Sequence, residues 1–379
     1  MTDLAAITAQ LAARAEEHDR EATFPHEGVA LVHQHGLLTE TVAARYGGPG
    51  AGLGRTVEIL TALGAGDPAV ALVTAMTLFN HAGQALAPTW PAPYYQRVLA
   101  ESAAAPTLIN ALRVEPELGS PARGGLPATV ARRVADGWSL SGRKIFSTGG
   151  EALAWMLVWA RTDEDEPRVG SFLVRGGSPG LRIERTWDHL GLRASRSDDV
   201  VLDDVRVPVD ATIDLAVPVP DARGATLFAW NCLGLTAMYL GVANAARDWL
   251  VRFLHERVPT SLGRPLATLP RFEAAVGEIE ARLASAAVLV RALAGGVDAG
   301  DPEAIRRAPV GKLIGTRAAI ESVQDAVALV GNNALNRRNP LERHLRDVLC
   351  ARIHTPQDDT ILTAAGKAAL SRFGKECNP

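Results

Sequence analysis

The sequence predicts a multidomain α+β protein with an N-terminal α-helical domain, a central antiparallel β-domain and a C-terminal four-helix bundle. Two observations lead to this prediction. With 379 residues, the chain is longer than a single hydrophobic core usually serves, so two or three domains are expected. In addition, residues 138–207 show the alternation typical of strands, whereas the segments on either side show helical spacing. We expect domains at residues 1–107, 108–217 and 218–379.

The N-terminal part is rich in Ala, Leu, Glu and Arg at helical spacing over residues 2–105. Proline and glycine interrupt the spacing at Phe24-Pro25, at residues 46–50 and at residues 87–91. Because these residue types end helices, the segment predicts several short helices rather than a few long ones.

The central part alternates apolar and polar residues in several short runs, at Trp138 to Leu140, 156–160 and 200–207, with a β-branched and aromatic run at 171–174. Pairs of glycines at 149–150 and 176–177 mark turns between the runs. Short strands separated by turns predict an antiparallel β-domain of about a hundred residues, which is an ordinary domain size.

The C-terminal part regains helical spacing over 226–291, with one interruption at 259–270, and again over 302–330 and 342–369. Four long helices packed as a bundle fit this pattern.

Composition narrows the class of protein. A net charge of −3 and a pI near 6.3 do not indicate the excess of basic residues that is typical of nucleic-acid-binding proteins. The N-terminus has acidic residues where a signal peptide needs basic ones, and no apolar run approaches the roughly 18 residues of a membrane span, so we expect no membrane insertion. Cys232, Cys350 and Cys377 are odd in number and form no CxxC pair, which favours a reducing cytoplasm without structural zinc or another metal.

Several short motifs occur in a characteristic order. Residues 113–120 read RVEPELGS, residues 142–150 read GRKIFSTGG, and residues 188–199 read DHLGLRASRSDD. Near the C-terminus, HER stands at 255–257, VGNN at 330–333 and LRD at 345–347. In their order and spacing, these motifs resemble the acyl-CoA dehydrogenase superfamily over nearly the whole chain, and they imply its fold.

The resemblance implies a bound FAD. Phe146 matches the aromatic residue that packs on the flavin ring, Thr148 matches the hydroxyl residue that hydrogen-bonds the flavin edge, and Ser147 lies between them as a further cofactor contact. A planar apolar wall with one polar donor suits a cofactor whose electronics the protein tunes. The alternative for Phe146 is an ordinary core aromatic. Trp187 and His189 precede a loop that leads to the flavin in the family, and packing within the β-domain is their alternative.

Other cofactor contacts follow from the same resemblance. Val114, Gly119 and Ser120 would face the flavin or the acyl pocket through backbone groups and a hydroxyl. Gln357 and Asp359, which follow the last motif, are also assigned to the cofactor.

A second subunit is implied as well, because FAD in this family lies across a dimer interface. Arg257 offers a bidentate positive charge for the cofactor pyrophosphate, and an exposed helix cation is its alternative. Gly331 and Asn332 would approach the same phosphates from the neighbouring subunit. A homodimer or homotetramer is therefore expected.

The expected catalytic base is missing. In acyl-CoA dehydrogenases, a glutamate shortly after the RD pair removes the α-proton of the thioester while a hydride passes to the flavin. Counting from the RD pair, Thr355 occupies this position, and a threonine hydroxyl is no base near pH 7. Some members carry the glutamate on the first helix of the C-terminal bundle, where this chain has Asn231.

Three interpretations remain open. In the first, the protein dehydrogenates an acyl thioester, passes electrons to an acceptor protein, and uses His354 or Asp358 as the base; the ordinary pKa of histidine, near 6.5, suits this role. In the second, it resembles flavin-dependent monooxygenases such as dibenzothiophene monooxygenase, which use oxygen and need no strong base. In the third, it binds FAD without activity. The overall pattern favours an acyl thioester as the substrate class.

Overall fold

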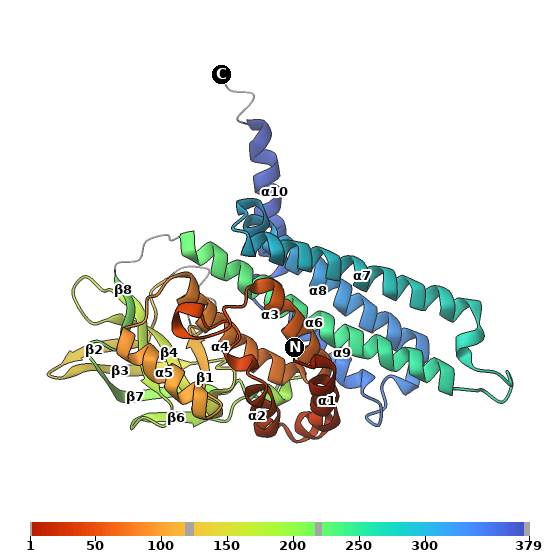
Figure 1. The fold of residues 1–379 in the computed structure, drawn as a ribbon, viewed down its shortest axis with the longest axis horizontal. Coiled ribbons are helices and arrows are strands. Elements are labelled where there is room, and N and C mark those ends of the chain that lie inside the picture. Colours follow the sequence, from red (N-terminus) through yellow and green to blue (C-terminus); the bar gives the residue numbers. More distant parts are fainter. Residues whose placement is uncertain (1, 118–124, 217–221, 375–379) are drawn as a thin grey trace.

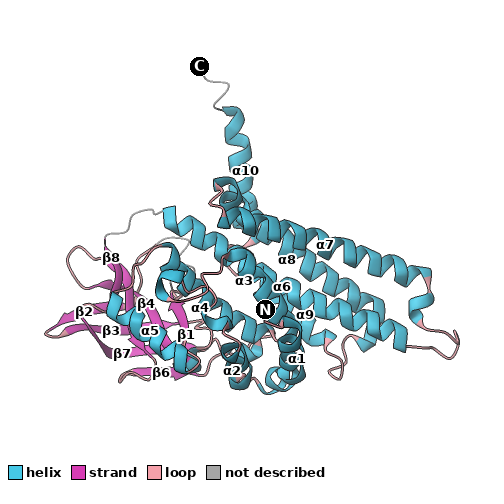
Figure 2. Cartoon of the chain, viewed as in Figure 1, coloured by secondary structure: helices cyan, strands magenta, loops and turns pink. Residues whose placement is uncertain are grey.

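The computed structural model describes residues 2–117, 125–216 and 222–374 of the chain. Within these ranges, helices stand at both ends of the sequence and strands in its middle (Figure 1). Figure 2 shows the sheet at one end of the molecule, with the long C-terminal helices extending away from it. The predicted α+β class, with its order of helices, sheet and helices, is confirmed.

The N-terminal helices end where proline and glycine were predicted to end them. Helix α1 (Leu4–Glu21) stops before Phe24-Pro25, and α2 (His26–Gln34) starts directly after that pair. Two short turns and the glycine-rich segment separate α2 from α3 (Leu53–Gly66). Asp67 caps the next helix, because its carboxylate accepts hydrogen bonds from the backbone N–H groups of Ala69 and Val70. Helices α4 (Pro68–Leu86) and α5 (Ala92–Ala104) complete the domain.

The central sheet is mixed, which corrects the expectation of a purely antiparallel domain. Its hydrogen-bonded order is β6-β7-β3-β2-β4-β5-β8, and β1 pairs with β4 outside this path. Both β1 and β2 run parallel to β4, and the other neighbours are antiparallel. Alternation along one strand reports which face is buried, and it carries no information about the direction of the neighbour. The strands are β1 (Leu108–Leu112), β2 (Val130–Val134), β3 (Gly137–Lys144), β4 (Leu153–Thr162), β5 (Val169–Arg175), β6 (Leu181–Glu184), β7 (Asp199–Pro208) and β8 (Thr212–Ala216).

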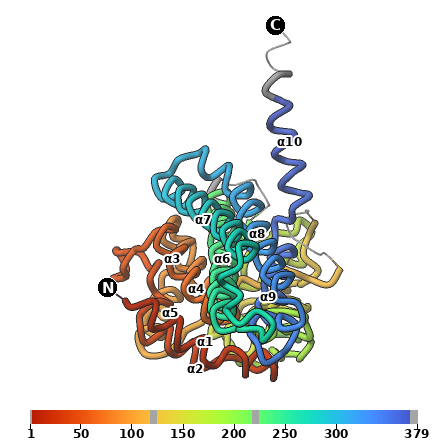
Figure 3. Tube along the Cα trace, turned by 90° about the vertical axis from the view of Figure 1, so that its right-hand side faces the viewer, coloured from red at the N-terminus to blue at the C-terminus, as the bar shows by residue number. Residues whose placement is uncertain are grey.

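The C-terminal domain has three long helices, α6 (Ala222–Glu256), α7 (Pro270–Asp298) and α8 (Pro302–Val330). The fourth predicted helix, 342–369, is divided into a short α9 (Leu341–Leu349) and α10 (Asp358–Gly374). Pro356 lies in the break, and a residue before proline avoids the helical conformation, so the helix ends earlier than the apolar spacing suggested. Helix α10 projects away from the body of the molecule (Figures 1 and 3).

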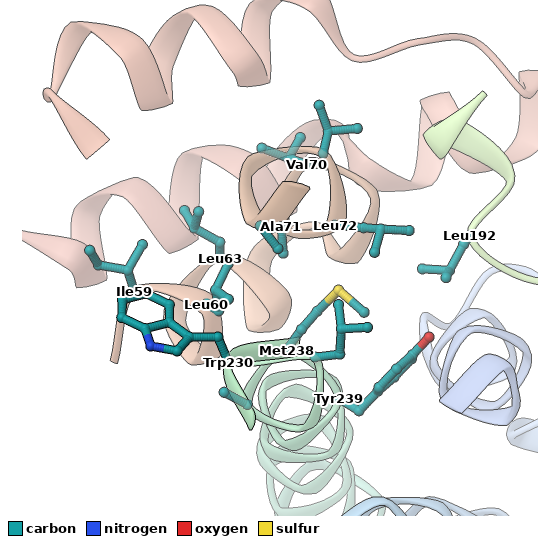
Figure 4. Packing of buried hydrophobic residues seen from close by; sticks show 14 of the residues in the cluster. Ile59, Leu60, Leu63, Val70, Ala71, Leu72, Leu192, Trp230, Met238 and Tyr239 are labelled. Carbon is teal, nitrogen blue, oxygen red and sulfur yellow. The ribbon is translucent and has the colours of Figure 1, made fainter. Parts of the chain in front are cut away.

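Helix α6 is the centre of the helical core. Contrary to the expectation from sequence, its residues 224–256 are long and apolar enough for a membrane span by length and composition, yet 72% of the most apolar window is buried inside the fold. Helix α3 crosses it closely, since a Cβ on Gly64 would lie 2.2 Å from the carbonyl oxygen of Met238. Figure 4 shows Met238 among side chains of α3 and α4, whereas Tyr239, the next residue, points toward the C-terminal segment drawn in blue. One helix thus links the N-terminal core to the segment after α9.

Candidate functional site

A cavity of about 430 Å³ opens where the three domains meet. It brings together eight of the residues singled out from sequence: Val114, Phe146, Thr148, Trp187 and His189 from the β-domain, and Asn231, His354 and Thr355 from the C-terminal domain. The remaining lining residues are Leu72, Met76, Leu192, Ser197, Leu235, Cys350 and Ile353. None of the lining residues that the structure describes is Asp or Glu, so the cavity is mainly apolar, with a few hydroxyl, amide and imidazole groups.

An aromatic surface forms one wall of the cavity. The Phe146 side chain is 52% exposed, and its backbone has a φ of +56°. A bulky residue rarely adopts this left-handed conformation, and such strain concentrates at functional sites. The Phe146 ring stands edge-on to Trp187 and His189, which stack on each other with centroids 3.6 Å apart. The alternative of a core aromatic is therefore wrong for Phe146, and an exposed planar wall of this kind fits a flavin ring.

A row of hydroxyl groups lies beside this wall. The hydroxyl oxygens of Thr148 and Ser197 are 3.0 Å apart, and the Ser197 oxygen is 2.9 Å from that of Ser195. The Thr148 carbonyl accepts a hydrogen bond from the Asn110 side chain at 3.1 Å. These contacts hold the Thr148 hydroxyl in one place at the cavity, as a donor to a flavin edge requires.

A buried ion pair supports the strands that carry this wall. The Lys144 ammonium group is fully buried and lies 2.6 Å from a carboxylate oxygen of Glu115. The carboxylate also accepts hydrogen bonds from the hydroxyl and backbone N–H of Thr129. Burial opposes the charge, but the hydrogen bonds from Lys144 and Thr129 outweigh it and lower the pKa of Glu115. Because Val114 precedes Glu115 and its carbonyl accepts a hydrogen bond from the N–H of Ile145, the ion pair supports the segments that carry Val114 and Phe146.

Neutral hydrogen bonds hold the opposite wall. The side-chain amide of Asn231 donates to the Thr355 carbonyl at 3.0 Å, so Asn231 tethers the loop to α6. The Nδ1 atom of the partly buried His354 lies 3.0 Å from the hydroxyl oxygen of Tyr239. Burial, with a smaller effect of the Lys312 charge, lowers the pKa of His354 to about 4. His354 is therefore neutral and weakly basic at pH 7, and Asp358 is bound to Arg317 outside the cavity lining.

Three of the expected cofactor residues lie far from the cavity in the same chain. Arg257 follows the end of α6, and Gly331 and Asn332 follow the end of α8, at the end of the bundle away from the sheet (Figure 1). At a helical rise of 1.5 Å per residue, Arg257 is on the order of 40 Å along α6 from Asn231. All three residues are exposed. They could contact the same cofactor as Phe146 only through a second chain, as the resemblance implies.

The other expected cofactor residues do not line the cavity. Ser147 is buried, and its hydroxyl has no hydrogen-bond partner within the described ranges. Gln357 and Asp359 lie at the start of α10, and Asp359 is exposed. Gly119 and Ser120 fall outside the described residues. Sequence reasoning also missed Ser197, Tyr239 and Lys312, because no motif distinguishes them from ordinary loop or helix residues.

Comparison with known proteins gives the same order of domains. Residues 5–86, 113–205 and 224–369 match the family models described as acyl-CoA dehydrogenase N-terminal, middle and C-terminal domain. The chain is 33% identical over 370 residues to "Putative acyl-CoA dehydrogenase YdbM" of Bacillus subtilis (strain 168), covering 96% of this chain and 94% of the relative. It is 31% identical over 374 residues to L-evernosamine nitrososynthase of a Micromonospora species, covering 91% and 83%.

A solved structure resembles the whole fold. The X-ray structure of KijD3 in complex with FMN and dTDP-3-amino-2,3,6-trideoxy-4-keto-3-methyl-D-glucose superposes with a TM-score of 0.85 at 27% identity. The similarity covers 97% of this chain and 92% of that one.

Proposed function

The chain belongs to the acyl-CoA dehydrogenase family and is a flavin-dependent oxidoreductase, and we propose that it transfers oxygen rather than dehydrogenating an acyl thioester. One observation supports this proposal above the others: no described residue of the cavity lining is a carboxylate. A positioned general base typically contributes about 10²- to 10⁴-fold to proton abstraction. Thr355 and Asn231 occupy the expected positions, and burial lowers the pKa of His354 to about 4, so the described lining lacks a strong base for this task.

The residues present suit oxygen transfer. Phe146 and the stacked Trp187 and His189 offer a wall for the flavin ring, and Thr148 offers a hydroxyl at its edge. A reduced flavin bound there would supply the electrons for oxygen activation, with one oxygen atom passing to the substrate and the other leaving as water. Leu72, Met76 and other apolar side chains exclude water from the reacting atoms. We propose a small, largely apolar substrate and oxygen as the electron acceptor.

Whether the protein uses FAD or FMN depends on contacts from a second copy of the chain. We expect FAD, because Arg257 and the Gly331 turn can meet its pyrophosphate only across an interface between two copies. KijD3 binds FMN, which carries a single phosphate. The proposal includes a homodimer or homotetramer for this reason, and FMN is the comparison ligand in the tests below.

Anaerobic and aerobic mixing experiments test the proposed function. The FAD-loaded protein is mixed without oxygen with butanoyl-, octanoyl- and palmitoyl-CoA, and the oxidised flavin band is followed. We expect no bleaching. The chemically reduced protein is then mixed with isotopically labelled dioxygen and a panel of small amines, thioethers and indoles, and mass spectrometry detects products that gain one labelled oxygen atom.

A second candidate is the acyl-CoA dehydrogenase reaction, which the relationship to the Bacillus subtilis protein favours. Bleaching of the flavin by any of the acyl-CoA thioesters would establish it and overturn the oxygen-transfer proposal. The base would then have to come from outside the described cavity lining.

A further inference from the structure

Tyr239 connects the buried core of α6 to the cavity. Its side chain is 0% exposed, and its hydroxyl lies 3.0 Å from Nδ1 of His354, with the two rings tilted by 44°. Figure 4 shows the Tyr239 hydroxyl pointing away from the α3–α4 side chains, toward the C-terminal segment. The imidazole therefore has one nitrogen engaged by the core, while His354 itself lines the cavity.

The direction of this hydrogen bond follows from the proton of the phenol. Burial raises the pKa of Tyr239 well above its ordinary value, so the hydroxyl keeps its proton. Within the described ranges, the hydroxyl has no hydrogen-bond partner other than Nδ1. A buried O–H left unpaired is costly, so Tyr239 donates and Nδ1 accepts. A neutral imidazole carries a single N–H, which must then be on Nε2.

Lys312 acts on the charge of the same imidazole. Its side chain is 1% exposed, and the ammonium group donates to the carbonyl of Pro356 at 2.9 Å and lies 3.5 Å from that of Ala351. These carbonyls flank the segment that carries His354. No carboxylate oxygen among the described residues lies within 4.0 Å of the Lys312 nitrogen. Burial lowers the pKa of Lys312, while Cys232 and Asp358 partly offset this effect. The Lys312 charge, which no carboxylate pairs with directly among the described residues, opposes a second positive charge on His354.

We propose that Tyr239 and Lys312 are positioning residues that hold His354 as a neutral imidazole with its Nε2–H available to the cavity. Tyr239 selects which nitrogen bears the proton, and Lys312 disfavours the doubly protonated ring. Two further titratable groups lie near this pair: burial raises the pKa of Cys350 to about 12, so it remains a neutral thiol, and raises that of Asp347, which acts on Tyr239 and Cys350, to about 7. Nε2 has no hydrogen-bond partner among the residues that the structure describes.

The role of this N–H rests on the proposed oxygen transfer. Negative charge develops on oxygen during that reaction, and a fixed donor in a water-poor cavity stabilises such charge. A neutral donor retains its proton, whereas an imidazolium would release it to the oxygen. The same arrangement explains why His354 is unsuited to removing an α-proton.

Nitrogen NMR of the full-length, FAD-loaded protein with nitrogen-15-labelled histidine tests the arrangement directly. We expect His354 to show an unprotonated Nδ1 and a protonated Nε2, with no titration between about pH 5 and 8, since burial holds its pKa near 4. The spectrum of His354→Gln assigns the signals. An Nδ1–H tautomer, or an imidazolium at neutral pH, would overturn the proposal.

Two variants separate the two contributions. Tyr239→Phe should shift the tautomer ratio toward Nδ1–H by about three- to tenfold, the worth of a typical hydrogen bond. Lys312→Met should leave the tautomer in place and move the titration of His354 to higher pH. Unchanged His354 signals in both variants, with the fold retained by circular dichroism, would show that neither residue positions the imidazole.

The chain offers a matched control in its N-terminal domain. There Nδ1 of the fully buried His81 lies 3.0 Å from the hydroxyl of the buried Tyr95, in a pair that does not line the cavity. Tyr95→Phe should alter the His81 signals and leave those of His354 unchanged. If the NMR results are as expected and no labelled oxygen reaches any substrate, the proposed function fails while the positioning of His354 stands.

Discussion

The two walls of the cavity are held by different kinds of interaction. The β-domain wall, with Phe146 and Thr148, rests on a fully buried ion pair between Lys144 and Glu115. The C-terminal wall, with His354 and Thr355, is held by hydrogen bonds from the neutral Asn231 and Tyr239 side chains and from the buried Lys312 ammonium group. The first wall keeps the motif residues of the family, and the second lacks its base. This difference is the basis of the proposed function: the wall proposed for the flavin is present, and the described lining of the opposite wall has no carboxylate.

The largest expected effect is on stability, through the two buried lysines. Lys144→Met leaves the Glu115 carboxylate buried without its partner, and breaking such a pair typically costs about 3–5 kcal/mol. Lys312→Met removes only a donor to two carbonyls and should cost about 1–3 kcal/mol. Urea unfolding of both variants measures the difference. Equal losses of unfolding free energy would mean that the ion pair of Lys144 contributes no more to stability than the hydrogen bonds of Lys312.

Phe146→Ala should weaken flavin binding with little change in stability, because the ring is already half exposed in the folded protein. Truncating a packed aromatic costs about 3–5 kcal/mol, part of which would appear as a loss of affinity of about 10- to 100-fold. Fluorescence titration with FAD measures it. The control is Phe228→Ala, which removes an exposed ring on α6 that does not line the cavity. Unchanged affinity in Phe146→Ala would place the flavin elsewhere.

Arg257→Ala distinguishes the two forms of flavin. A hydrogen bond to a charged group contributes about 1.5–3 kcal/mol, so FAD should bind about tenfold or more weakly while FMN binding stays the same. Parallel titrations with FAD and FMN check this expectation. Equal binding of FAD by the variant and the natural protein would remove Arg257 from the cofactor site and weaken the case for a shared interface.

His354, in the C-terminal wall, should make the stability of the protein sensitive to acid. Burial lowers the pKa of His354 to about 4, below the ordinary 6.5. A group with a lowered pKa contributes its stability fully above pH 6.5, and this contribution is lost as the pH falls toward 4. His354→Gln should therefore flatten the decline in stability between about pH 6.5 and 4. Thermal unfolding across this range, compared with His35→Gln, which removes an exposed histidine, would show whether the effect is specific to His354; an unchanged slope would contradict it.

The smallest expected effect is that of Thr355→Glu. It places a carboxylate where the family removes the α-proton, and a working base would raise flavin reduction by about 10²- to 10⁴-fold. Under the oxygen-transfer proposal, acyl-CoA thioesters still leave the flavin oxidised in this variant, while FAD remains bound. A measurable gain in flavin bleaching would show that the cavity still accepts acyl thioesters and would favour the dehydrogenase reaction.

Residues close together in the sequence were sufficient to predict much of the architecture. Pro25 and the glycines after Tyr46 ended helices where expected, and the GRKIFSTGG motif located Phe146 and Thr148 on the cavity. Such features depend on residues close together in the chain. The break between α9 and α10 was missed although Pro356 was visible, since the apolar spacing on both sides continued across it.

What the sequence by itself determined is the order of the domains, the family and the absence of a glutamate at position 355, because these depend on composition, spacing and motif. The tertiary structure alone decided that β1 and β2 run parallel to β4 and that Lys144 pairs with Glu115. It also placed Tyr239 against His354, 115 positions away in the chain. The ordinary pKa of histidine suggested a base, whereas burial lowers the pKa of His354 to about 4 and so makes it a weak base. Burial and long-range contact are properties of the packed chain, and no local pattern encodes them.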